Sequence, residues 1–169
     1  MEKPENMSFT INKIDLRNNL TSIGSLIRRS HQTVAQQFNI TLQNCPHHPA
    51  FCDDASTLAK LDRPGIICFG GHINGELSGF VALAPVDGHD INCVRLAVAP
   101  EARHFGLGRS LMDECVRVAR EIGAQTMTIE VIDWNKQLKQ WYFDFGFVEV
   151  CKQDWHGAPF VVCKMELKL

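Results

Sequence analysis

The sequence has no excess of one charge and no long hydrophobic run. Of its 169 residues, 17 are Lys or Arg and 19 are Asp or Glu, which gives a formal net charge of -2. A protein that holds nucleic acid through general electrostatics needs a basic stripe, and no run of like charges supplies one. No apolar run approaches the roughly 20 residues of a membrane-spanning helix. We therefore expect neither a nucleic-acid partner nor a membrane partner.

Paired cysteine motifs and a secretory signal are also missing. The seven cysteines are scattered and odd in number, without a CxxC pair, which is typical of reduced thiols. The first residues, MEKPENMS, contain no apolar core of a signal peptide. These absences favour a cytoplasmic protein. The length and the 45% hydrophobic content fit a flexible tail at residues 1–7 followed by a single domain at residues 8–169.

Hydrophobic periodicity predicts alternating strands and helices. The expected order is a strand at 8–14, a long helix with an apolar face from Leu16 to Phe38, a loop at 39–53, a short helix at 54–61 capped by Asp54, strands at 66–73, 76–85 and 91–100, a helix that starts at the glycine turn 103–108, a strand at 126–132, a helix at 135–145, and strands at 147–153 and 160–169.

Two connections indicate how these strands pair. Asn74-Gly75 tolerates the positive φ of a tight hairpin turn, so the strands on either side of it should be antiparallel. The strand at 126–132 follows a crossover helix and should therefore run parallel to the strand at 91–98. The sequence predicts a mixed, mostly antiparallel α/β sheet in one layer.

The turn RHFGLG, residues 103–108, suggests an anion site, because a glycine turn before a helix gathers free N–H groups at the positive end of the helix dipole. Tight packing of the strand against the helix would also favour these glycines. A P-loop does not fit, since Arg103 replaces its first glycine and Arg109 its lysine. The dinucleotide fingerprint fails as well, because Leu111 stands at its third glycine.

A different phosphate-binding pattern does fit. Val98 to Gly108, V-A-P-E-A-R-H-F-G-L-G, resembles the acyl-CoA signature V-x-P-x-x-[RQ]-x-x-G-x-[GA] of the GNAT superfamily of N-acyltransferases. Asn135, followed by W-Y-F-D-F-G-F at 141–147, is similar to the second block of that family. The resemblance covers nearly the whole chain and implies a GNAT-type sheet flanked by helices on both faces.

The resemblance implies acetyl-CoA as co-substrate and a set of residues that hold it. The backbone of Leu96, Ala97 and Val98 would bind the pantetheine arm and the thioester carbonyl, although their apolar character fits ordinary strand core equally well. Asn135 would contact the pantetheine or cap the helix that begins there, and Asp133 competes for that cap. The pyrophosphate would lie on the amides of His104, Phe105, Gly106, Leu107, Gly108, Arg109 and Ser110, with local positive charge from Arg103 and Arg109.

Tyr142, the single tyrosine, occupies the position of the family's acid, which protonates the departing thiolate. A core aromatic is the alternative interpretation. No carboxylate lies on the strand INCVRLAV, where many relatives place a general base. Glu130, Glu76 and His72 are the remaining candidates, and a water relay or bulk solvent would also serve.

The segment Cys45–Cys52 carries two cysteines and two histidines. Adjacent histidines and two prolines make tetrahedral coordination awkward, so we expect no metal. By the resemblance, this segment lines the acceptor entrance, with Trp155 and His156 as weaker candidates for the same wall.

The sequence thus predicts transfer of an acyl group, most simply acetyl, from acyl-CoA to a primary amine by direct attack in a ternary complex. The acceptor amine, a small molecule or a protein, stays open, as does a homodimer. The alternative function is a silent sensor or partner protein that binds coenzyme A without turnover.

Overall fold

The computed structural model describes residues 8–86, 88–155 and 157–169, so the expected tail at 1–7 lies outside the described residues. Its elements, in chain order, are β1 (Phe9–Lys13), α1 (Leu20–Gln37), the short 3-10 helix η1 (Pro49–Phe51), α2 (Asp54–Leu61), β2 (Ile67–Ile73), β3 (Glu76–Pro85), β4 (Asp90–Val98), the 3-10 helix η2 (Pro100–Ala102), α3 (Leu107–Glu121), β5 (Thr126–Ile132), α4 (Lys136–Phe145), β6 (Val148–Asp154) and β7 (Val161–Lys168).

The strands form one seven-stranded sheet in the order β1-β2-β3-β4-β5-β7-β6. All neighbours are antiparallel except β4 and β5, which run parallel, as the crossover helix predicts. The parallel ladder covers only Asp90–Asn92 and Thr126–Thr128. Beyond that short ladder the two central strands separate, which opens the middle of the sheet.

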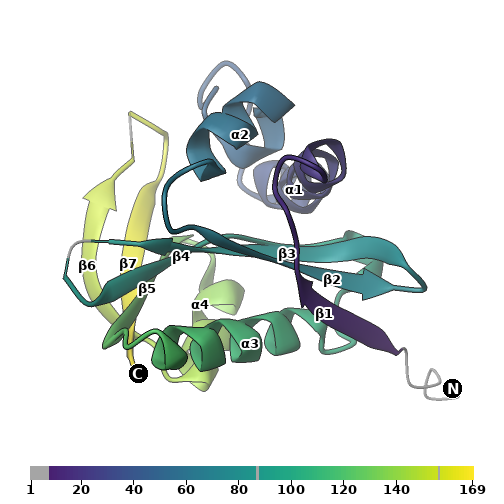
Figure 1. Cartoon of the computed structure of the whole chain (residues 1–169). Helices are drawn as coiled ribbons and strands as arrows, with labels where there is room; N and C mark the ends of the chain where they lie inside the picture. The colour runs from purple at the N-terminus through teal and green to yellow at the C-terminus, as the bar shows by residue number, and fades with distance from the viewer. Residues whose placement is uncertain (1–7, 87, 156) are drawn as a thin grey trace, which may run out of the picture.

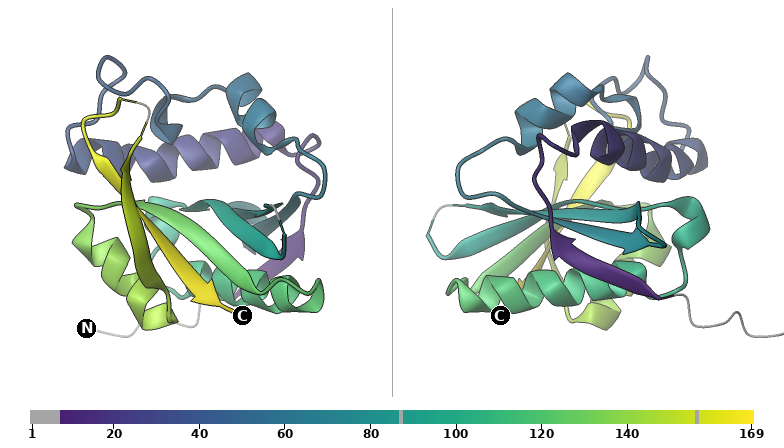
Figure 2. Two further views of the ribbon diagram at one scale, coloured as in Figure 1. Left: turned by 90° about the vertical axis from the view of Figure 1, so that its left-hand side faces the viewer. Right: turned by 45° about the vertical axis from the view of Figure 1, so that its right-hand side comes forward.

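Helices cover both faces of the sheet. In Figures 1 and 2, α1 and α2 lie on one face, and α3 and α4 lie on the other. The long helices α1 and α3 have apolar stripes that meet the sheet; in α1, for example, Ile23, Leu26 and Ile27 are buried. The main core continues through the sheet, with Phe69 and Phe80 fully buried. The mixed, mostly antiparallel fold with helices on both faces is confirmed.

Two glycines allow α3 to approach the sheet closely. A Cβ added to Gly71 would lie 2.6 Å from Leu107 Cδ1, and one added to Gly79 would lie 2.7 Å from Leu111 Cδ1. Leu107 and Leu111 belong to the first turns of α3 and are almost fully buried. The start of α3 is therefore fixed by the absence of side chains on β2 and β3.

A second, smaller core joins two distant segments. Ile40, Cys45 and Ala50, from the loop between α1 and α2, pack with Phe160 and Val162 from the end of the chain. The left view of Figure 2 shows the tip of the β6–β7 hairpin beside that loop. These two segments together form one side wall of the central opening.

Two details of the expected helices are wrong. Leu16 lies before α1, which begins only at Leu20, although Leu16 is still buried in the core. Asp53, not Asp54, caps α2: its carboxylate accepts from the Ser56 N–H at 2.7 Å. Asp54 is instead paired with Arg28 at 2.8 Å, so a tertiary ion pair decides between two adjacent aspartates.

Other local predictions are confirmed. The hairpin turn has φ values of 52° at Asn74 and 83° at Gly75, and Gly123 is left-handed just after α3.

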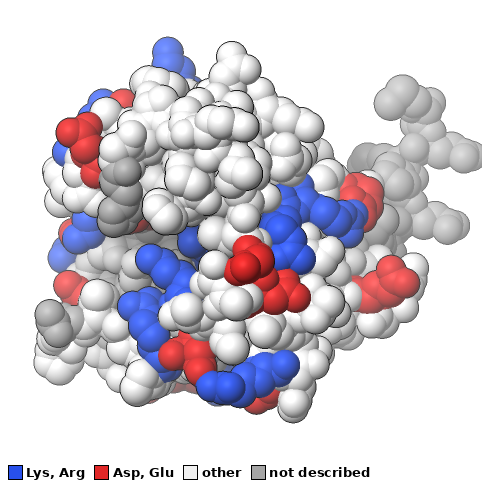
Figure 3. All heavy atoms as spheres, turned by 90° about the horizontal axis from the view of Figure 1, so that it is seen from above, with Lys and Arg blue, Asp and Glu red and all other residues white. Residues whose placement is uncertain are grey.

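Among the described residues, no helix has the length and apolar character needed to cross a membrane. Figure 3, which views the face with α1 and α2, shows basic and acidic side chains interspersed.

Candidate active site

A cleft of about 770 Å³ opens where β4 and β5 separate. Its walls come from α1, η1, β4, the glycine turn, β5, α4 and the end of the β6–β7 hairpin. Its lining includes Ser30, His31, His48, Arg95, Leu96, Val98, Arg103, His104, Gly106, Gly108, Arg109, Glu130, Asn135, Tyr142 and Trp155. Most of the predicted site residues therefore lie on one continuous surface.

A bulge distorts β4 beside this cleft. Phe80 pairs with Ala97 and Ala82 pairs with Val94, so two residues of β4 stand opposite one residue of β3. The first of the two, Arg95, has a φ of 57°, a backbone angle that residues with a Cβ rarely adopt. The bulge turns the strand and directs new groups into the cleft.

The predicted pantetheine-binding residues follow the bulge. Leu96 and Val98 line the cleft, whereas Ala97 is buried and does not. The Val98 N–H donates to Ser30 Oγ at 3.3 Å, so α1 already uses this amide. Arg95 and Leu96 have no paired residue on β3 or β5, so their backbone groups are the candidates for binding a ligand.

The glycine turn has the geometry of an anion site. His104 and Gly106 are both left-handed, with φ of 67° and 89°, and Gly106 is the N-cap of α3. The first-turn amides of a helix have no intrahelical acceptor, which leaves those of Leu107, Gly108 and Arg109 for a ligand. The Ser110 N–H, however, donates to Gly106 O at 2.9 Å. The predicted contribution of the Ser110 amide is therefore wrong, and only its side chain is left to reach a ligand.

Gly106 and Gly108 are glycines for different reasons. At Gly106 a side chain would have open space but a strained backbone. At Gly108 an added Cβ would lie 3.5 Å from Val98 Cγ2, an ordinary contact. The protein itself therefore tolerates a methyl group at position 108, and the glycine leaves room for something else in the cleft.

The two arginines of the turn differ in their contacts. Arg103 donates to Ser30 O at 2.9 Å, to Thr33 Oγ1 at 3.0 Å and to Val98 O at 3.3 Å. Its guanidinium thus ties α1 to the end of β4. Arg109 lies at the entrance, with its guanidinium carbon 4.3 Å from the centre of the Phe145 ring.

Leu107 and Phe105, the apolar members of the turn, have opposite environments. Leu107 is 1% exposed and anchors the turn to the sheet, so it offers only its amide to a ligand. Phe105 is 36% exposed and does not line the cleft.

Tyr142 is buried on α4, yet it lines the cleft. Its ring packs edge-on against Trp141 at 5.0 Å and Phe147 at 5.5 Å. Burial raises the pKa of the Tyr142 phenol well above its usual value, and the nearby thiols of Cys93 and Cys115 add to the rise. The hydroxyl therefore keeps its proton across the physiological pH range.

Asn135 caps α4, as one of the two predicted roles requires, and its contact with the pantetheine arm stays a prediction. Its carboxamide oxygen accepts from the Leu138 N–H at 3.1 Å and so caps α4, while the residue also lines the cleft. Asp133 does not compete for the cap, because Lys139 and Lys152 hold its carboxylate at 2.7 and 3.0 Å.

One group of potential metal ligands occurs in the described parts of the chain. Asp133, Glu149 and Cys163 place one ligand atom each within 4.8 Å of the others. Lys139 pairs with both carboxylates, so an ammonium already balances their charge. In the segment Cys45–Cys52, His48 Nδ1 accepts from the Ala50 N–H at 3.3 Å.

Two histidines, which the sequence analysis did not consider as a pair, line the cleft on the α1 side. His31 lies on α1 and His48 precedes η1, and their ring centroids are 6.1 Å apart. Burial, together with the charge of Arg95, lowers the pKa of His31 to about 3 and that of His48 to about 4. Both imidazoles are therefore neutral at neutral pH.

The hydrogen bonds define which ring nitrogen carries the proton. His31 Nδ1 lies 2.9 Å from Ile27 O, and because a carbonyl only accepts, Nδ1 must be protonated. His31 Nε2 therefore has a lone pair. His48 accepts at Nδ1, so its Nε2 is a donor. The wall thus offers one acceptor and one donor.

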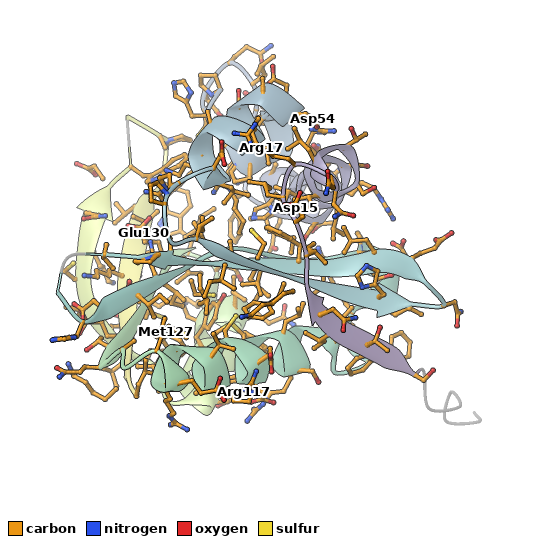
Figure 4. The ribbon with its side chains drawn as sticks, in the orientation of Figure 1. Asp15, Arg17, Asp54, Arg117, Met127 and Glu130 are labelled. Carbon is orange, nitrogen blue, oxygen red and sulfur yellow. The ribbon has the colours of Figure 1, made fainter. Side chains whose placement is uncertain are left out.

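Of the three candidate bases, only Glu130 lines the cleft. It lies on β5, and Figure 4 shows it on the α1 side of the sheet, with Met127 pointing toward α3. Gln153 Nε2 donates to Glu130 Oε1 at 3.2 Å. His72 and Glu76 lie beside the β2–β3 turn and do not line the cleft.

The predicted acceptor wall is partly present. His48, Pro49 and Trp155 line the cleft, and Trp155 stacks on Phe160 with ring centroids 5.8 Å apart. His156, the other candidate of the late turn, lies outside the described residues.

Comparisons with known proteins agree with this geometry. A family model described as the Acetyltransferase (GNAT) family matches residues 31–147. An uncharacterised N-acetyltransferase of Schizosaccharomyces pombe is 29% identical over 153 residues, which cover 87% of this chain and 86% of that protein.

Solved structures show the same fold. The ribosomal-protein-S18-alanine N-acetyltransferase of Escherichia coli is 19% identical, with a TM-score of 0.76, over 95% of this chain and 94% of that chain. A putative acetyltransferase of Salmonella typhimurium, solved with its cofactor acetyl-CoA, is also 19% identical, with a TM-score of 0.71 and the same coverage.

Proposed function

Because the chain belongs to the GNAT family of acetyl-CoA-dependent N-acetyltransferases, we propose that it transfers an acetyl group directly to a primary amine in a ternary complex. The observation that carries the proposal is the separation of β4 and β5 into a cleft that begins at the first turn of α3. One end of the cleft presents helix amides, and the other presents polar side chains.

The residues present fit acetyl-CoA. The amides of Leu107, Gly108 and Arg109 would face an anion bound at the positive end of α3. Gly108 allows the backbone to approach that anion closely, since its missing side chain would not clash with the protein. The backbone near Leu96, beside the bulge, would align the thioester arm, and Asn135 would contact it with the carboxamide nitrogen that its capping role leaves free.

Bound acetyl-CoA supplies an activated thioester, so the chain itself needs to bind, orient and move protons. Tyr142 would donate its proton to the departing thiolate. Its raised pKa keeps the phenol protonated, so the hydroxyl is available to hydrogen-bond the thiolate, a base of reference pKa about 8.5, as it develops.

The acceptor amine would enter from the side of α1. There it meets Glu130 and the lone pair of His31 Nε2, two groups that can accept its hydrogen bonds. Direct attack in a ternary complex needs no nucleophile from the protein.

Initial-rate kinetics tests this mechanism. We expect intersecting double-reciprocal plots when acetyl-CoA and an amine are varied, and no acetylated protein after incubation with acetyl-CoA alone, measured by mass spectrometry. Parallel plots with a stable acetyl-protein would contradict it. Tight acetyl-CoA binding without turnover of any amine would support the silent sensor instead.

A further inference from the structure

Arg95 is a charged side chain inside the cleft with no partner in the described parts of the chain. It lines the cleft from the bulge of β4 and is partly buried. No ion pair or hydrogen bond from its guanidinium to a described residue is present. Withdrawing a charge from water without a partner is costly, so such a group points to a ligand that completes it.

The backbone at Arg95 supports a functional role. A φ of 57° strains the backbone of a residue with a long side chain, and such strain concentrates at ligand sites. In a regular strand, the side chain of Arg95 would follow the alternation of its neighbours between the two faces of the sheet. The bulge instead places the guanidinium near the imidazoles of His31 and His48, whose pKa values its charge lowers.

The surroundings of Arg95 separate it from the pyrophosphate end of the cleft. His31 and His48 come from α1 and the segment before η1, and α1 covers the face of the sheet opposite α3 (Figure 1). Arg103, by contrast, donates its hydrogen bonds to Ser30, Thr33 and Val98. Arg95 therefore lies in the part of the cleft that is lined by His31 and His48, which we call the acceptor half. Its guanidinium N–H groups make no hydrogen bond to a described residue.

Glu130 provides the opposite charge from the facing strand. The charge of Glu130 acts on Arg95, but the two form no ion pair in the described parts of the chain; the β4–β5 ladder ends before both, at Asn92 and Thr128. A gap with a cation on one side and an anion on the other is complementary to a zwitterion.

We propose that the acceptor is an amine that also carries a carboxylate, with Arg95 binding the carboxylate and Glu130 facing the amine. This inference rests on the proposed function. A guanidinium binds a carboxylate through two parallel N–H···O bonds. A phosphate dianion fits less well, since Glu130 shares the space and Arg95 is the single cation there with free donors among the described residues.

The first part of the test uses matched acceptors. Release of free coenzyme A thiol is measured with a panel of L-amino acids, with the carboxamide of each, and with O-phosphoethanolamine. We expect kcat/KM for the preferred amino acid to exceed that for its carboxamide at least ten-fold. Equal or faster turnover of carboxamides, preference for O-phosphoethanolamine, or no turnover of any amino acid would overturn the inference.

The second part uses variants of Arg95. Arg95→Met should abolish the preference for the carboxylate by raising KM for the amino acid. Arg95→Lys, which keeps a positive point charge, should retain part of that preference. Arg63→Gln, at an exposed position after α2, is the matched control and should keep the preference.

Acetyl-CoA titrations of the same variants separate this inference from the proposed function. Unchanged acetyl-CoA affinity in Arg95→Met, together with lost selectivity, supports a carboxylate site. Selectivity retained in Arg95→Met would overturn that site, whereas failure of the wild type to bind acetyl-CoA would overturn the proposed function itself.

Discussion

Tyr142 combines two properties that rarely occur together in a core aromatic. Its ring is packed between Trp141 and Phe147, yet the residue borders the cleft. The packing holds the ring in one orientation, and the raised pKa holds the proton. A fixed, protonated phenol is suited to donate, because no reorganisation is needed when the thiolate develops.

Tyr142→Phe removes only the hydroxyl. We expect kcat to fall about 10²-fold, since a positioned acid contributes roughly that factor or more. The ring packing is kept, so the melting temperature and the acetyl-CoA affinity should change little. Steady-state kinetics and thermal unfolding measure both.

Phe143→Leu, a half-exposed position on the same helix, serves as the control and should retain the wild-type kcat. Full turnover by Tyr142→Phe would remove the acid role. A basic limb of the kcat profile below about pH 10 that disappears in Tyr142→Phe would contradict the raised pKa of the phenol.

The sequence could predict site residues that lie in contiguous motifs. Gly106, Gly108 and Tyr142 stand at fixed places in two short blocks, and all three line the cleft. Arg95 and His31 were missed, because they meet only when β4 bends and α1 crosses the sheet. The available signal was weak: Arg95 is the one charged residue inside the strand INCVRLAV.

Predictions of roles depended on contacts that a motif does not contain. Arg103 was expected to add charge for phosphate, but its donors bind Ser30, Thr33 and Val98. The Ser110 amide was expected in the cradle, but the helix already uses it. The spacing of a motif fixes where a residue lies, whereas its neighbours decide which of its atoms are free.

At the scale of elements, α3 is the part whose position matters most. Its first turn carries the anion-binding amides, and that turn is fixed by Leu107 and Leu111 against Gly71 and Gly79. A small displacement of the helix would move every amide of the turn. Packing of the core and binding of acetyl-CoA are therefore coupled through these contacts.

Gly79→Ala tests this coupling. The new Cβ would meet Leu111 Cδ1 at 2.7 Å and Leu107 Cδ2 at 3.1 Å, so α3 or its side chains must shift. We expect a loss of about 1–3 kcal/mol in the free energy of unfolding and a weaker acetyl-CoA affinity. Chemical denaturation and calorimetry measure the two effects.

Ser78→Ala, at the adjacent position of β3, is the control for the substitution itself and should affect neither quantity appreciably. If Gly79→Ala lowered stability without changing acetyl-CoA affinity, the placement of the helix would not govern the site.

The order and type of elements followed from the sequence, since strong periodicity and turn residues specify them locally. Asn74-Gly75 and the crossover before β5 are examples, and both are confirmed. The start of α1 and the cap of α2 did not follow. Asp53 and Asp54 are equally good caps, and only the ion pair of Asp54 with Arg28 distinguishes them.

At the scale of the molecule, folding leaves two imidazoles neutral around one guanidinium. In an unfolded chain His48 has a pKa near 6.5, and in the fold burial and the charge of Arg95 lower it to about 4. Below pH 6.5 the unfolded chain therefore binds protons that the folded chain does not. Stability is complete above that pH and falls as the pH drops toward 4.

His48→Gln should flatten this dependence. Between pH 7 and pH 4, the wild type should lose roughly 3 kcal/mol more unfolding free energy than the variant, from a pKa difference of about 2.5. Denaturation at a series of pH values provides the measurement. His47→Gln, exposed and adjacent, should show the wild-type slope, and an equally steep slope in His48→Gln would contradict the neutral imidazole.

Two separate hydrophobic cores hold the two ends of the cleft in position. The main core fixes α3 and the donor end of the cleft, while the small core around Phe160 and Ile40 fixes the acceptor wall. The separation of β4 and β5 leaves the two ends facing each other.

The most direct test of the account is calorimetric titration of the wild type and Gly108→Ala with acetyl-CoA, with ATP and NAD as controls. The protein accommodates a methyl group at position 108 in ordinary contact with Val98, and alanine favours a helical turn. The account predicts one acetyl-CoA per wild-type chain, no comparable binding of ATP or NAD, and at least ten-fold weaker acetyl-CoA binding by Gly108→Ala at an unchanged or higher melting temperature. Undiminished acetyl-CoA affinity in Gly108→Ala, or wild-type binding of ATP or NAD as tight as that of acetyl-CoA, would contradict the assignment of the glycine turn to the pyrophosphate of coenzyme A.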